Sequence, residues 1–79
     1  MADVKRIDQM YAFVAIDPQD NTEGVISIEE GGTIFPLVGA DMERVEQLRP
    51  LALGIAELYK TSVMLLRFST REEVEQLGG

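Results

Sequence analysis

An unbroken apolar run, Tyr11-Ala12-Phe13-Val14-Ala15-Ile16, stands near the start of the chain and ends at Asp17-Pro18. Its aromatic and β-branched residues favour a strand. Successive side chains of a strand point to opposite faces, and both alternating sets are apolar in this run, so we expect a strand that is buried on both faces. The run therefore predicts the central strand of a sheet, with other elements packed around it.

Turn-forming residues predict two further strands after this one. Residues 25–29 and 34–38 are rich in β-branched and aromatic residues, and they flank Gly31-Gly32, which is typical of a β-hairpin turn. Pro36 has no backbone N–H to donate, so the strand over residues 34–38 is predicted to lie at an edge of the sheet.

A long helix is predicted over residues 42–60, because Asp41 is a good N-cap and the apolar residues that follow recur at helical spacing. Pro50 lies inside this helix and predicts a kink. Residues 62–68 form a second run that is apolar on both faces, and we interpret it as the fourth strand. Ser69 and Glu72 fit a capping box, which predicts a short helix over residues 70–77. The residues that form the apolar stripe of the long helix are Val45, Leu48, Ala52, Ile55 and Tyr59.

The expected fold is α+β, with a four-stranded mixed sheet in the order 3-2-1-4. The elements follow as β-β-β-α-β-α, with the long, Pro-kinked helix on one face and the short helix at the C-terminus. In this topology the fourth strand enters parallel to the first by a right-handed crossover. Residues 1–9 are expected to be a flexible N-terminal arm, and residues 10–79 a single α+β domain.

Composition narrows the classes of function. The chain of 79 residues has no Cys and no His, and 7 basic against 14 acidic residues give a net charge of −7. Without His or Cys, the commonest general base, the thiol nucleophile and the usual zinc ligands are missing. Its acidity opposes binding to nucleic acid. We therefore expect no catalytic residue, no metal or cofactor, no nucleic-acid or membrane partner, and a cytoplasmic protein.

The second face of the predicted sheet indicates a partner. One long helix covers one face, while the other face also carries apolar side chains, so something must cover it. We expect a homodimer, formed through the open face or through the edge of the fourth strand; another protein, or cover by the terminal helix and arm, are the alternatives. The role is thus that of a small acidic interaction or regulatory protein without enzymatic activity. The interface candidates are Phe13, Ile34, Phe35, Leu65, Arg67 and Phe68.

The chain ends in Gly78-Gly79, which on a small β-rich domain resembles the tail of ubiquitin-like and sulfur-carrier proteins. In those families the carboxylate of the terminal glycine is adenylated and then forms a thioester, a thiocarboxylate or an isopeptide. Their domains begin with a β-hairpin, place the helix next and run the tail from the last strand, whereas three strands precede the helix here. We therefore interpret the two glycines as a helix stop, and a carrier protein is the alternative function.

Overall fold

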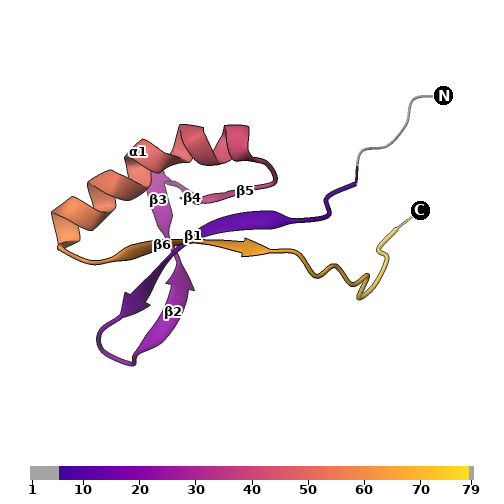
Figure 1. The fold of residues 1–79 in the computed structure, drawn as a ribbon, viewed down its shortest axis with the longest axis horizontal. Helices are drawn as coiled ribbons and strands as arrows, with labels where there is room; N and C mark the ends of the chain where they lie inside the picture. Colours follow the sequence, from indigo (N-terminus) through magenta and orange to yellow (C-terminus); the bar gives the residue numbers. More distant parts are fainter. Residues whose placement is uncertain (1–5, 79) are drawn as a thin grey trace.

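The computed structural model describes residues 6–78 and confirms the α+β class, with a single helix and antiparallel strands in that part of the chain (Figure 1). Of the predicted arm, residues 1–5 lie outside the described residues, and residues 6–9 lead into the first strand without regular structure. The elements are β1 (Met10–Asp17), β2 (Thr22–Val25), β3 (Ser27–Glu30), β4 (Thr33–Pro36), β5 (Val38–Gly39), α1 (Met42–Tyr59) and β6 (Val63–Phe68).

Strand β1 is the central strand, as predicted. One edge pairs with β6, from Met10 opposite Phe68 to Ala15 opposite Val63. The other edge pairs with both β2 and β5, one after the other. All these pairs are antiparallel, so the prediction of a mixed sheet in the order 3-2-1-4 is wrong, although the strand after the helix does lie beside β1.

A second hairpin accounts for this difference. Each of the two predicted strands at residues 25–29 and 34–38 is split, because the chain leaves the edge of β1 at Ile26, forms the separate hairpin β3–β4, and returns at Leu37. The N–H of Phe13 donates to the carbonyl of Leu37 (3.0 Å), the N–H of Ile26 to the carbonyl of Phe13 (2.9 Å), and the N–H of Leu37 to the carbonyl of Ile26 (2.8 Å). The detour leaves β5 running in the direction of β2. The crossover through α1 then brings β6 in parallel to β5, and hence antiparallel to β1.

The turn of the β3–β4 hairpin lies at Gly31 and Gly32, as predicted. Their φ angles are +58° and +83°, and a type I′ turn requires positive φ at both central residues, which glycine adopts without strain. Pro36 ends β4, opposite Ser27. Because the hairpin is two-stranded, Pro36 lies on an edge strand, and its missing N–H leaves no gap in a central ladder.

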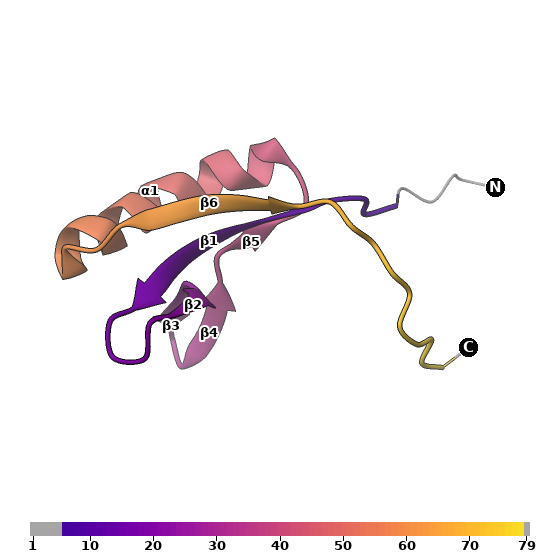
Figure 2. The ribbon, with the colours of Figure 1, turned by 60° about the horizontal axis from the view of Figure 1, so that its bottom comes forward.

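Helix α1 covers one face of the sheet, and its bounds agree with the prediction to within one residue (Figures 1 and 2). The Asp41 carboxylate caps it by accepting a hydrogen bond of 2.9 Å from the N–H of Arg44. Its apolar stripe packs against the side chains of β1 that face the helix and against Leu37, where the chain rejoins the sheet. The buried core consists of Tyr11, Phe13, Leu37, Val45, Leu48 and Ala52.

The predicted short helix over residues 70–77 is wrong, since residues 69–78 form neither helix nor strand. This segment leaves the end of β6 and runs away from the sheet (Figure 2). Val74 and Leu77, the apolar residues meant to anchor the helix, are 87% and 83% exposed. A helix of two turns is unstable in water unless its apolar face is packed, and no such packing exists here within residues 6–78.

Candidate interaction site

Within residues 6–78, the face of the sheet that points away from α1 is apolar except at Glu23. Strand pairing defines its members, because residues opposite each other in an antiparallel ladder point to the same face. Phe13 and Leu65 form such a pair and pack toward the helix, so the alternate residues point the other way. We call this surface the open face; its apolar members are Met10, Ala12, Val14, Ile16, Val25, Val38, Met64, Leu66 and Phe68.

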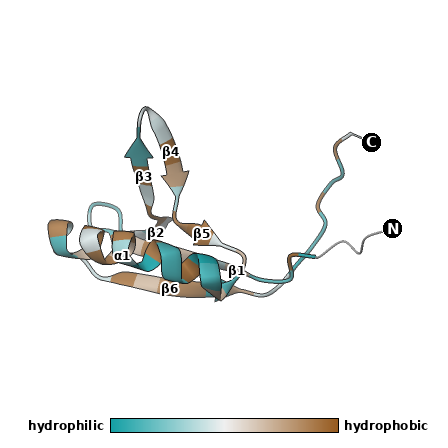
Figure 3. Ribbon diagram, turned by 90° about the horizontal axis from the view of Figure 1, so that it is seen from above, coloured by the Kyte–Doolittle hydropathy of each residue, from teal (hydrophilic) through white to brown (hydrophobic). Residues whose placement is uncertain are grey.

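No element among residues 6–78 covers the open face, since α1 and the β3–β4 hairpin both pack on the opposite side. At its centre, Ala12 and Val14 are buried, at 4% and 3% exposed. Around them Ile16, Val25 and Phe68 are 46%, 49% and 54% exposed. Apolar colour follows most of β6 in Figure 3. An exposed apolar sheet surface of this kind is typical of an interface.

Charged groups lie around the open face rather than on it. By register its one acidic member is Glu23, opposite Ile16 at the end of the β1–β2 ladder. In the adjoining loop the Asp17 carboxylate accepts from the N–H of Gln19 (2.8 Å), and Asp20 accepts from the hydroxyl of Thr22 (2.7 Å). This last hydrogen bond lowers the pKa of Asp20. The loop carboxylates thus stabilise the turn, and the sheet surface itself presents almost no charge to be desolvated.

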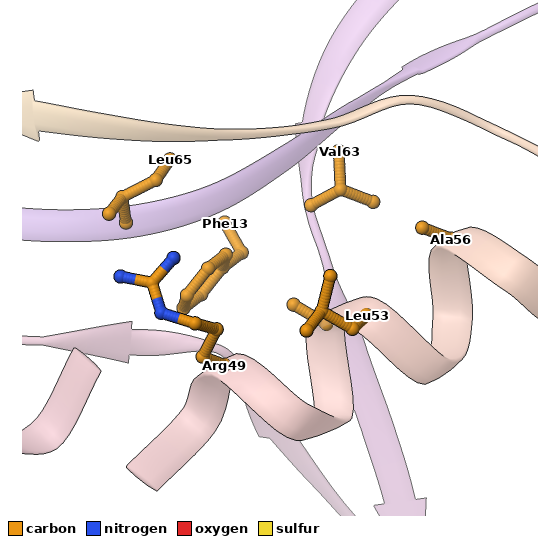
Figure 4. A pocket seen from close by; sticks show the side chains of 7 residues that line it. Phe13, Arg49, Leu53, Ala56, Val63 and Leu65 are labelled. Carbon is orange, nitrogen blue, oxygen red and sulfur yellow. The ribbon is translucent and has the colours of Figure 1, made fainter. Parts of the chain in front are cut away.

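A small cavity lies on the other side of the sheet, between α1 and β6 (Figure 4). Its volume is about 200 Å³, below the roughly 300 Å³ at which small-molecule sites begin. Arg49 lies at this cavity and forms an ion pair of 2.9 Å with Glu46, which lowers the pKa of the Glu46 carboxyl and raises that of Arg49. The lining offers no nucleophile or general base, and it consists of Phe13, Arg49, Ala52, Leu53, Ala56, Val63 and Leu65.

The six predicted interface residues occupy three different places. Phe13 and Leu65 face α1 and line this cavity, and Phe13 is only 4% exposed. Arg67 and Phe68 are exposed at the end of β6, and of the six only Phe68 belongs to the open face.

Ile34 and Phe35 lie on the β3–β4 hairpin and point to its two opposite faces. Phe35 is opposite Ile28 and lines a groove between the hairpin and α1, whereas Ile34 is opposite Glu29 and is 66% exposed. The structure therefore does not gather the six candidates into one surface.

Most members of the open face were absent from the predicted set. The signal for them was present, because the alternating residues of β1 and β6 are apolar in both phases. Which phase faces the helix depends on how the strands pair, and the sequence pattern leaves that open.

Comparison of the chain with protein-family models, with curated proteins and with solved structures finds no match. Within residues 6–78, no helix has both the length and the apolar character needed to cross a membrane. The same residues contain no group of three or more carboxylate, His or Cys side chains placed to hold a metal ion.

Proposed function

We propose that this chain is a small, acidic, non-enzymatic interaction protein that acts through an interface with a second copy or with another protein. The observation that carries the proposal is the open face, an apolar surface of a folded sheet that no element within residues 6–78 covers. Single exposed apolar residues are common on protein surfaces, but a contiguous set across three neighbouring strands is not.

The energetics of the open face favour association. Full burial of a Val, Ile or Phe side chain contributes about 1.5–3 kcal/mol. Ile16, Val25 and Phe68 are each about half exposed, so each retains about 1 kcal/mol that a partner can add. Against this stands the cost of desolvating Glu23, which lies at the rim. A well-fitted apolar partner surface would therefore bind with little electrostatic penalty.

Charge placed on the open face tests the proposal. The double variant Val25→Lys/Phe68→Lys puts two ammonium groups on this surface at positions that are already half exposed. The matched control is Ile34→Lys, an exposed apolar strand position outside the open face. Binding is measured by photo-crosslinking in cells of the source, with peptide mapping of the crosslinked site. We expect crosslinks at the open face that the double variant removes and Ile34→Lys retains. The circular dichroism spectra of both variants should match that of the wild type. Loss of the crosslinks in Ile34→Lys alone would contradict the proposal.

A carrier protein is the second candidate, and one observation favours it. The predicted helix before the glycines is absent, so residues 69–78 form an exposed segment that follows directly from the last strand. This is the arrangement that the resemblance to ubiquitin-like and sulfur-carrier proteins requires of a reactive tail; Gly79 itself lies outside the described residues. Deletion of Gly79 alone distinguishes the two functions. A carrier loses its activity and any adduct on the terminal carboxylate, whereas an interaction protein retains binding.

A further inference from the structure

We propose that a second copy of this chain pairs with β6 edge to edge, antiparallel and centred on Leu65, so that the two sheets become one. The inference rests on the proposed function and deepens it, because it names one partner and the strand that receives it. The surface involved is the free edge of β6 together with the cavity beside it, and it is distinct from the open face.

One edge of β6 pairs with no other strand among residues 6–78, and the strand register identifies the residues whose backbone groups point to this edge. Both the N–H and the carbonyl of Phe13 point to the β2/β5 side, where they bond Leu37 and Ile26. Phe13 and Leu65 are therefore a non-hydrogen-bonded pair, and in an antiparallel ladder such pairs alternate with hydrogen-bonded ones. It follows that Leu65, and with it Val63 and Arg67, directs its backbone groups outward to the free edge.

The outward N–H and carbonyl groups of one β6 strand can pair with those of a second β6 strand. When two β6 strands run antiparallel about a two-fold axis through Leu65, Leu65 lies opposite its own copy and Val63 lies opposite Arg67. Each of these is then a hydrogen-bonded pair that exchanges two bonds. Every outward group of the strand is satisfied in this register, and the two Arg67 side chains stay apart.

The two edges of the sheet differ in their protection. Soluble proteins block exposed edges with charges, prolines, bulges or breaks in the strand. The β2/β5 edge has Glu23 and Gly24, and it is interrupted by the β3–β4 hairpin and Pro36. In contrast, β6 is six residues long, contains no Pro or Gly, and has Arg67 as its only charged residue. An unprotected edge of this kind is a strand-pairing site.

Charge favours a second copy at this edge in spite of the net charge of −7. Two acidic chains repel each other unless they meet where neither is acidic. Strand β6 contains no acidic residue, and β1 contributes one only at its far end, Asp17. On the helix side, Glu46 is paired with Arg49, and Glu57 lies one helical turn beyond Leu53. Strand β6 itself therefore adds no acidic side chain to an edge-to-edge contact.

The surface beside β6 also exposes an apolar side chain of α1. Leu53 on α1 is 60% exposed next to the cavity that Val63 and Leu65 line.

This pairing leaves the open face free. A two-fold axis that makes two strands antiparallel in one sheet stands perpendicular to that sheet, so both α1 helices lie on one side and both open faces on the other. The dimer thus presents a double-width apolar surface for a different partner. For this reason the edge and the open face can be tested separately.

The first test removes an outward N–H without changing the rest of the strand. Arg67→Pro deletes the donor that would bond Val63 of the second copy, and Arg67→Ala is the matched control that retains it. Both remove the same side chain, which is exposed in the structure. Self-association of the full chain is measured by sedimentation equilibrium. We expect a wild-type dimer, a dissociation constant raised roughly tenfold or more by Arg67→Pro, and little change for Arg67→Ala.

A second test reads the register. The chain has no Cys, so single-cysteine variants report one distance each. In the proposed register two Leu65 residues face each other at about 5.5 Å between Cα atoms, which a disulfide spans. Two Leu66 residues are diagonal neighbours at about 7–8 Å, beyond its reach. We expect Leu65→Cys to form a covalent dimer under mild oxidation, and Leu66→Cys not to.

The outcomes separate this inference from the proposed function. A wild-type monomer throughout the micromolar range, a dimer unaffected by Arg67→Pro, or preferential crosslinking of Leu66→Cys would each overturn edge pairing. A dimer that Val25→Lys/Phe68→Lys dissociates and Arg67→Pro leaves intact would assign self-association to the open face; it would refute the inference and support the proposed function. If edge pairing holds and the double variant loses no binding, the proposed role of the open face fails instead.

Discussion

Leu37 is the residue whose truncation tests the described core most directly. Its side chain is fully buried at the point where the chain returns from the hairpin to β1, and it packs in the cluster that joins β1 to α1. Leu37→Ala removes this side chain and leaves a cavity. Because the backbone on both sides is fixed by bonds to Phe13 and Ile26, the site has little freedom to collapse. The expected loss is therefore within the range of about 2–5 kcal/mol found for such substitutions.

This loss is large for a domain of this size. At about 0.05–0.15 kcal/mol per residue, a chain of 79 residues has about 4–12 kcal/mol of stability. For domains of 60–100 residues each kcal/mol corresponds to about 4–8 °C, so a loss of about 3 kcal/mol lowers Tm by about 12–24 °C.

Urea unfolding followed by circular dichroism measures the loss, with Leu58→Ala as the control. Leu58 is 73% exposed on α1, so the same chemical change there should alter stability by no more than about 0.5 kcal/mol. Equal effects of the two substitutions, or a loss below about 1 kcal/mol for Leu37→Ala, would refute the placement of Leu37 in the core.

Four further predictions follow from local contacts and charge. Gly39→Ala places a Cβ 2.8 Å from Cγ of Arg44, so thermal melts should show a loss of about 1–3 kcal/mol that Arg44→Gly partly relieves. Asp41→Ala removes the helix cap and should cost about 1 kcal/mol in the same assay, whereas Asp41→Asn should not. The pKa of Glu46 is lowered from 4.5 by Arg49, so this pair stabilises the fold above that value and loses its effect as the pH falls through the lowered pKa; melts of Glu46→Gln should lack this component. Added salt screens the net charge of −7, so sedimentation should show tighter self-association at higher ionic strength.

The elements that could be predicted from sequence are those whose signals are local. An apolar run ended by Asp17-Pro18 gave β1, and an N-cap followed by a helical stripe gave α1. The division of the two middle strands could not be predicted, because Ile26 and Leu37 are apolar residues that continue each run. Their role as the exit and return points of the hairpin depends on bonds to Phe13, a residue distant in sequence.

In the terminal segment, the sequence predicted an element that does not form. Ser69 and Glu72 satisfy a local rule for beginning a helix, yet the segment has no surface on which to pack. Val74 and Leu77 remain exposed, and the local signal is too weak to stabilise two turns by itself. The capping box therefore predicted a helix that does not form.

The candidate site was predictable as a property and not as a set of residues. Apolar side chains in both phases of β1 and β6 predicted that a second face needed cover, and the open face has that character. The individual candidates were chosen by size and position, which does not determine phase. Leu65 and Leu66 are equivalent in the sequence, but one faces α1 and the other faces away.

The core and the two proposed interfaces are connected through stability. Only eight apolar residues are buried among those described, and a small domain without disulfides is marginally stable when its core is this limited. A partner that binds only the folded chain adds to its stability, by an amount that grows with the logarithm of the partner's concentration above the dissociation constant. Pairing at β6 would order the strand that carries Leu65 and Leu66. It would therefore stabilise both the side of the core against which Leu65 packs and the part of the open face to which Leu66 belongs. Self-association at the edge of β6 would thereby stabilise the open face, the surface that a different partner binds.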